Sequence, residues 1–240
     1  MLSDYPGSNY RTMEDFMNLS IRTIPGNCIV AIILPILLLC FSSTVVASYE
    51  LPKQFNPSAN YLFFFHNYYV EKNGPNGDCK YYDILSAFAD QGYTVISDLR
   101  PANVQFYNYI EKATSNIEKV LAAGVPPEKI TVAGHSKGGI IVIQIASRLK
   151  QPRVKYAIFA GCGIQSAAKA YPDFTQLEGT FLSLYAENDT VASSCRNFFA
   201  QSANHPDFTE SVLHSTAGHR LFFTPERLWL EPAMNWIQEH

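Results

Sequence analysis

The sequence is poor in charge and lacks the residue clusters that bind nucleic acids or metal ions. Only 16% of its 240 residues are charged, the formal net charge is −3, and no stripe of Lys and Arg stands out. Binding to the phosphates of a nucleic acid needs such a basic patch, so we expect no nucleic-acid partner. The five cysteines form no C-x-x-C pair and no cluster with histidine, and we therefore expect no metal ion.

Internal repeats, low-complexity segments and an interdomain linker are also lacking, which argues against repeat proteins and disordered chains. The glycine pattern of a dinucleotide site is incomplete, because Gly161 and Gly163 are not followed by the third glycine. A tight connection after a strand explains this pair, and we expect no cofactor. Hydrophobic residues make up 47% of the chain, which is enough for one sizeable core.

Charge is absent from residues 28–41, an apolar run with the length of a signal-peptide core. Arg22 precedes the run, and small residues ending at Ala47 offer a cleavage point. We interpret residues 1–47 as an N-terminal leader that contains a signal peptide or, if uncleaved, a membrane anchor over residues 28–47. The protein is therefore expected to be exported, either periplasmic or secreted, or tethered to the membrane by this segment.

Residues 48–240 form the predicted exported domain, which contains three of the five cysteines. An oxidising compartment permits one disulfide in this domain and leaves one thiol over. Cys162 follows one predicted strand and Cys195 follows the next, so these two residues are the candidate pair.

From residue 60 onward, short apolar strands alternate with helical segments. The six predicted strands are residues 61–65, 93–97, 129–133, 154–160, 180–186 and 208–215. The predicted helices are residues 80–91, 103–123, 137–149 and 225–239, and a polar, glycine-containing loop is predicted over residues 67–78. This alternation predicts an α/β fold in which a mostly parallel sheet of about six strands is covered by helices on both faces.

The segment 129–146 predicts a nucleophile elbow, which is a sharp turn that presents a serine between a strand and a helix. Its β-branched strand is followed by Gly134-His135-Ser136-Lys137-Gly138 and then by an apolar helix. This is the context in which the serine of a G-x-S-x-G pattern acts as a nucleophile. The alternative is a glycine-rich turn whose serine merely caps the following helix.

A serine hydroxyl needs a base to take its proton, and the base needs a carboxylate to orient it. Because ligands of parallel sheets bind beyond the carboxyl ends of the strands, the partners of Ser136 should follow predicted strands. His219 follows the last strand and is the predicted base, while Asp189 follows the strand 180–186 and is the predicted acid. Glu187 and Asp207 are the alternative acids. Taken alone, Asp189 is also typical of a turn or a helix N-cap.

The domain resembles the α/β-hydrolase superfamily from about Tyr61 to the C-terminus. The resemblance rests on the Gly134–Gly138 elbow, on the strand end at Asp189 and on the loop that carries His219. In that superfamily such positions hold the nucleophile, the acid and the base of an esterase-like or lipase-like triad, in the chain order Ser, Asp, His.

The resemblance also implies two backbone donors that bind the oxyanion formed during acyl transfer. One is the N–H of Lys137, and the other comes from the loop around His66, with Asn67 and Tyr68 as the candidates. His66-Asn67 stands where many relatives have His-Gly, so this loop departs from the usual pattern. Only residues 163–179 separate two strands where lidded relatives insert helices, which predicts a minimal fold without a lid domain.

From these residues we predict an exported serine hydrolase that cleaves a carboxylic ester of a small molecule through an acyl-enzyme intermediate. Ser136 is the predicted nucleophile, His219 the base and Asp189 the orienting acid. Two alternatives stay open. One is an acyltransferase that uses the same triad, and the other is a non-catalytic binding module with the same fold.

Overall fold

The computed structural model describes residues 49–240. The predicted leader, with its signal-peptide or anchor segment, lies outside the described residues. Within residues 49–240, no helix combines the length and the apolar character needed to cross a membrane.

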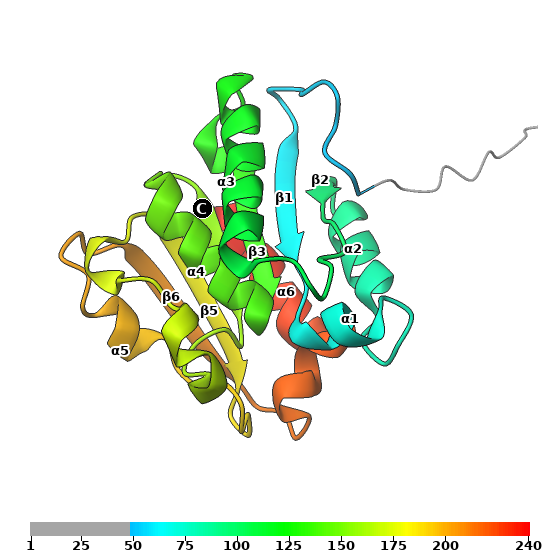
Figure 1. Ribbon diagram of the computed structural model, residues 1–240, viewed down its shortest axis with the longest axis vertical. Coiled ribbons are helices and arrows are strands. Elements are labelled where there is room, and N and C mark those ends of the chain that lie inside the picture. The colour runs from blue at the N-terminus through cyan, green and yellow to red at the C-terminus, as the bar shows by residue number, and fades with distance from the viewer. Residues whose placement is uncertain (1–48) are drawn as a thin grey trace, which may run out of the picture. The chain divides into compact units, whose positions relative to one another are not determined.

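Six strands form one sheet in this part of the chain (Figure 1). They are β1 (Asn60–Phe65), β2 (Tyr93–Ile96), β3 (Ile130–His135), β4 (Lys155–Phe159), β5 (Thr180–Ala186) and β6 (Asp207–Leu213). The order across the sheet is β2-β1-β3-β4-β5-β6, and each neighbouring pair is parallel. The predicted parallel sheet is confirmed, and the carboxyl ends of its strands therefore lie at one edge.

Helices cover both faces of the sheet because the strands bury side chains on both faces. On one face, Leu62 and Phe64 belong to the core that includes α2 (Tyr81–Ala89) and α6 (Arg227–Glu239). On the other face, Phe63 and Phe65 belong to the core that includes α3 (Phe106–Ala122) and α4 (Lys137–Leu149). Figure 1 shows α3 and α4 in front of the sheet and α6 behind it. α4 has the predicted bounds, and the other three helices differ from the predicted segments only at their termini.

The segment 67–78 was predicted to be a loop, and this prediction was wrong for its first half. Residues Tyr68–Asn73 form the short helix α1. The side chain of Asn67 caps it by accepting a hydrogen bond from the N–H of Val70 at 2.9 Å. The helix ends at Gly74, whose φ of 81° suits a glycine. The capping asparagine was the sequence signal for α1, but the glycines and polar residues around it favoured a loop.

The connection from β4 to β5 contains two short 3₁₀ segments, η2 (Gln165–Ala170) and η3 (Phe174–Gln176), and no α-helix. The remaining elements are η1 (Pro127–Lys129), α5 (Arg196–Phe199) and η4 (Gly218–Phe223). The predicted minimal fold without a lid domain agrees with this connection.

A disulfide joins Cys162, shortly after β4, to Cys195, immediately before α5, which confirms the candidate pair. The main chains of the two loops also meet, because the N–H of Ser193 donates to the carbonyl of Cys162 at 2.9 Å. Cys79 is a buried free thiol.

Candidate active site

The candidate site lies at the carboxyl edge of the sheet. Ser136 directly follows β3, Asp189 lies shortly after β5, and His219 lies in η4 after β6. In the sequence, His219 is 83 residues from Ser136 and 30 residues from Asp189. The three side chains meet because parallel strands end at the same edge.

The turn at Ser136 has the strained backbone expected of a nucleophile elbow. Its φ of 57° and ψ of −116° lie in a region that residues with a Cβ rarely adopt. The N–H of Ser136 donates to the carbonyl of Phe159, at the end of β4, at 2.8 Å. Gly138 is required next to this turn, because a Cβ there would overlap the carbonyl oxygen of Phe65. The close contact between α4 and β1 therefore depends on that glycine.

His219 forms hydrogen bonds with both Ser136 and Asp189. Its Nε2 lies 2.8 Å from Ser136 Oγ, and its Nδ1 lies 2.8 Å from Asp189 Oδ2. The other Asp189 oxygen accepts hydrogen bonds from the N–H groups of Val191 and Ala192, at 2.8 and 2.9 Å. A carboxylate that only accepts requires the proton of neutral His219 on Nδ1, which leaves Nε2 free to accept the Ser136 proton.

The environment of Asp189 favours its ionised form. Its side chain is fully buried, and burial by itself raises the pKa of a carboxyl group. Hydrogen bonds from His219 and from the N–H groups of Ala192 and Val191 outweigh the burial, and the pKa of Asp189 is lowered. Asp189 therefore carries a negative charge beside a histidine that can become positive.

The alternative acids lie elsewhere. Glu187 accepts a hydrogen bond from the exposed His214, with 2.7 Å between Oε2 and Nδ1. Asp207 is the first residue of β6 and therefore lies at the amino edge of the sheet, opposite Ser136. Of the three acids considered from the sequence, Asp189 is the one joined to His219.

A second histidine packs against His219 without sharing its contacts to Ser136 and Asp189. The ring centroid of His135 lies 4.9 Å from that of His219. Asn67 Nδ2 lies 3.0 Å from His135 Nδ1 and donates to it, which leaves the ring proton on Nε2. Burial, and secondarily the proximity of His219, lower the pKa of His135 well below its usual value. A neutral ring thus supports one side of the candidate base.

The three candidate residues for the two oxyanion donors lie at the start of α4 and at the start of α1. Lys137 is the first residue of α4 and Tyr68 is the first residue of α1, so neither N–H has an acceptor within its own helix. Asn67 precedes Tyr68 as the N-cap of α1. These residues line the same cavity as Ser136 and His219. Their function as oxyanion donors stays a prediction.

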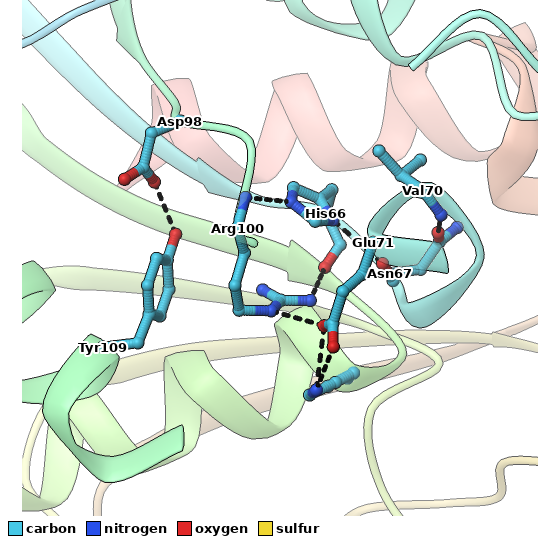
Figure 2. Close-up of polar contacts among 8 residues, drawn as sticks. His66, Asn67, Val70, Glu71, Asp98, Arg100 and Tyr109 are labelled. Atoms are coloured by element: carbon cyan, nitrogen blue, oxygen red, sulfur yellow. Dashed lines mark hydrogen bonds and ion pairs between the residues drawn. The ribbon is translucent and has the colours of Figure 1, made fainter. Parts of the chain in front are cut away.

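The side chain of Lys137 forms an ion pair with Glu71 of α1. Lys137 Nζ lies 2.8 Å from each of the two Glu71 carboxylate oxygens. Arg100, in the loop after β2, donates to the same carboxylate from Nε at 2.7 Å (Figure 2). Sequence reasoning gave no account of the charge at position 137 and missed both partners, because Glu71 and Arg100 lie far from it in the sequence.

A cavity of about 1020 Å³ lies in front of Ser136. Much of its lining is apolar or aromatic and includes Tyr68, Phe106, Ile140, Ile164, Val191 and Phe223. The charged residues that line it are Lys72, Lys137 and Lys169, and no acidic residue of the described chain lines it. Within residues 49–240, no group of three or more His, Cys, Asp or Glu side chains is placed to hold a metal ion.

A parallel sheet with a serine on a strand-to-helix elbow, and with a histidine and an aspartate at the same edge, defines the α/β-hydrolase architecture. A sequence model of the alpha/beta hydrolase family matches residues 72–213, more than half of the chain. The chain belongs to the alpha/beta hydrolase family and is therefore a hydrolase by family, as the resemblance predicted. No curated protein sequence matches it.

Solved structures with a similar fold include SOBER1 from Arabidopsis thaliana and an esterase/lipase from an uncultured bacterium. SOBER1 has a TM-score of 0.54 and 12% identity, and the match covers 76% of this chain and 99% of SOBER1. The esterase/lipase has a TM-score of 0.54 and 12% identity, with 76% of this chain and 77% of that chain covered. At these identities the likeness shows the fold alone.

Proposed function

We propose that this protein is an exported serine hydrolase that cleaves a carboxylic ester through an acyl-enzyme intermediate. The observation that carries the proposal is the pair of 2.8 Å contacts through which His219 joins Ser136 to Asp189. This arrangement gives the serine a base and gives the base a fixed tautomer, and acyl transfer by a serine needs both.

In the acylation step, Ser136 Oγ forms a bond to the ester carbonyl carbon while its proton moves to His219 Nε2. The carbonyl electrons move to the oxygen, and the N–H groups of Lys137 and of Tyr68 or Asn67 stabilise the oxyanion. The negative charge of Asp189 stabilises the imidazolium that forms. The tetrahedral intermediate then collapses, and the leaving alcohol takes its proton from His219.

In the deacylation step, a water molecule attacks the carbonyl carbon of the acyl-enzyme. His219 Nε2 accepts one proton of that water, and the same N–H groups bind the second oxyanion. Collapse releases the carboxylic acid and returns the proton to Ser136 Oγ. The route consumes one water per ester, and His219 carries every proton transfer.

The cavity indicates the kind of ester that fits. Its apolar and aromatic lining favours an acyl or alkyl group with considerable apolar surface. Its three lining lysines, with no lining carboxylate in the described chain, disfavour a positively charged substrate. We therefore expect neutral or anionic esters of small molecules as substrates.

Two observations support export. The sequence has an apolar, uncharged run at residues 28–41 followed by small residues up to Ala47. The domain also contains the Cys162–Cys195 disulfide, and disulfides persist mainly in oxidising compartments. The protein would be periplasmic or secreted, or tethered to the membrane by residues 28–47.

The test is labelling with a fluorophosphonate, which reacts with an activated serine, followed by mapping of the adduct by mass spectrometry. We expect the adduct on Ser136 in the wild-type chain and none on Ser136 in the His219→Ala variant. Ser136→Ala should lower kcat for p-nitrophenyl esters by several orders of magnitude and leave the melting temperature nearly unchanged. A folded wild-type chain that is neither labelled nor active would contradict the proposal and favour a binding module.

The acyltransferase alternative uses the same first step and differs in the acceptor. Product analysis in the presence of a competing alcohol separates the two reactions. Free acid as the main product supports a hydrolase, whereas a new ester as the main product would assign the triad to acyl transfer.

A further inference from the structure

Glu71 is a buried carboxylate near the candidate site that the proposed reaction does not use. Its side chain is 4% exposed. It accepts a hydrogen bond from Arg100 Nε at 2.7 Å and contacts from Lys137 Nζ at 2.8 Å on both oxygens. Burial alone would raise the pKa of Glu71, but the hydrogen bonds from Lys137 and Arg100 outweigh it and lower the pKa. Glu71 is therefore an anion held between two cations.

The three charged residues come from three separate parts of the site. Glu71 lies in α1, Arg100 follows β2, and Lys137 is the first residue of α4. Arg100 also fixes the segment that precedes α1, as Figure 2 shows. The Arg100 guanidinium donates to the carbonyl of His66 at 3.0 Å, and the backbone N–H of Arg100 donates to His66 Nε2 at 2.8 Å. The start of α1 is therefore attached to the rest of the site through this cluster.

Stability alone is a poor explanation for such a cluster. Buried ion pairs often contribute little net stability, because each charge must first lose its water. Arg100 Nη1 is also buried and has no hydrogen-bond partner within residues 49–240, which adds a further cost. The better-attested use of a buried charged group is to fix how two elements sit against each other.

The elements fixed by Glu71 are the two that carry the predicted oxyanion donors. Tyr68, one of the two candidates for the donor from this loop, lies in the first turn of α1 together with Glu71, and the other candidate, Asn67, is the N-cap of that helix. Lys137, whose N–H is the other donor, holds the Glu71 carboxylate with its own side chain. A contact between Asn67 and His135 joins the same two regions separately, at 3.0 Å. Glu71 and the Asn67–His135 contact together hold the two regions that carry these N–H groups.

We infer that Glu71 is a positioning residue for the oxyanion hole, which it assembles by holding α1 against the start of α4. This inference rests on the proposed esterase function. Glu71 does not touch the reacting atoms. It acts through Lys137 and through the turn that carries Tyr68, and so it should affect the transition state more than the bound substrate.

The test compares Glu71→Gln with wild type in two assays. One gives kcat and KM for a p-nitrophenyl ester, and the other gives Ki for a trifluoromethyl ketone, which adds to Ser136 and places an oxyanion in the hole. We expect kcat to fall about 10- to 100-fold, somewhat less than the loss of a whole donor. KM should stay within about twofold, and Ki should rise by a factor similar to the fall in kcat. Glu231→Gln is the matched control, because Glu231 pairs with Arg227 on the exposed side of α6, and its kinetics should be those of wild type.

A second variant keeps the inference testable if Glu71→Gln does not fold. Lys137→Met removes the ion pair but keeps the backbone N–H and the apolar stem of the side chain, so it should show the same pattern of lower kcat and weaker ketone binding. Where both single variants fold, the kcat of the double variant should be little lower than that of either single variant, because both substitutions break the same Glu71–Lys137 ion pair. Titration of active sites with a fluorophosphonate corrects each rate for unfolded protein.

The inference would be overturned if wild type is active and either Glu71→Gln or Lys137→Met keeps the wild-type kcat and Ki. The esterase proposal would then still stand. A fall in kcat without any rise in Ki would also overturn the inference, because the oxyanion hole would then be intact. A wild-type chain that neither hydrolyses esters nor reacts at Ser136 would overturn both.

Discussion

At the residue scale, the two oxygens of Asp189 serve different donors. Oδ1 accepts from the N–H groups of Val191 and Ala192, and Oδ2 accepts from His219. An asparagine has only one accepting oxygen, which the two backbone donors would hold, and its NH₂ group would then face His219 Nδ1. That forces the ring proton onto Nε2, where it blocks transfer from Ser136.

We therefore expect Asp189→Asn to lower kcat by roughly 10⁴-fold with a smaller effect on KM. Steady-state kinetics on a p-nitrophenyl ester measure the change. Asp207→Asn, at the opposite edge of the sheet, should behave as wild type. If Glu187→Gln abolished activity while Asp189→Asn did not, the assignment of the acid would be wrong.

The stability of the domain should depend on His66, which is neutral in the folded state. Its Nε2 accepts the N–H of Arg100 at 2.8 Å, so its proton lies on Nδ1, which faces the carbonyl of Asn67 at 2.9 Å. Burial, reinforced by the charge of Arg100, lowers the pKa of His66 to about 4. A histidine in the unfolded chain has a pKa of about 6.5. Below that pH the unfolded chain binds a proton that folded His66 does not, so the contribution of His66 to stability is complete above pH ~6.5 and is lost as the pH falls toward 4.

The expected loss from His66 is about 3 kcal/mol of unfolding free energy between pH ~6.5 and pH ~4. Urea unfolding at a series of pH values measures it. His66→Gln should be less stable than wild type at neutral pH yet lose less on acidification, while buried His135 still contributes a loss of the same sign. His205→Asn, in an exposed loop, is the matched control variant. Equal losses in wild type and His66→Gln would contradict the argument.

The residues of the candidate site differ in how far the sequence could predict them. Ser136, Asp189 and His219 could be placed together because each follows a predicted strand, and parallel strands end at one edge. Glu71 and Arg100 carry no such signal. Glu71 is a single charge on a short helix, and Arg100 is a single charge in a loop. They are 29 residues apart in the sequence, and Glu71 is 66 residues from Lys137.

At the element scale, the six strands and the four longest helices were predictable, whereas the short helix α1 was not. β5 and α4 have the predicted bounds, because a mostly apolar strand and a long, mostly apolar helix are strong local signals. The six-residue α1 is too short to be stable alone and depends on its Asn67 cap and on packing of Val70. The strand order, with β1 between β2 and β3, results from contacts between distant segments that no local pattern specifies.

At the scale of the whole domain, the β4–β5 connection forms one wall of the cavity in front of Ser136. Residues of η2, among them Ala167 and Ala168, line the cavity. The Tyr171 hydroxyl donates to the carbonyl of Gly161 at 2.8 Å and accepts from the N–H of Ile164 at 3.2 Å. These hydrogen bonds join the residues before η2 to the residue after it, and they hold the segment in place.

Two further contacts attach the same wall to the core. Gln144 of α4 donates to the carbonyl of Ala170 at 2.7 Å, and the Cys162–Cys195 disulfide lies just before η2. Opening η2 as a lid would break the hydrogen bonds of Tyr171 and Gln144, while the intact Cys162–Cys195 disulfide would limit the movement.

We therefore expect no interfacial activation, the jump in rate that lidded lipases show when substrate forms droplets. The rate of hydrolysis of p-nitrophenyl butyrate should rise hyperbolically with dissolved substrate and stay level as the concentration passes the solubility limit, because only dissolved ester enters an already open cavity. A lidded lipase in the same emulsion serves as the positive control. A severalfold jump at the solubility limit would contradict this expectation and would mean that η2 moves at the interface.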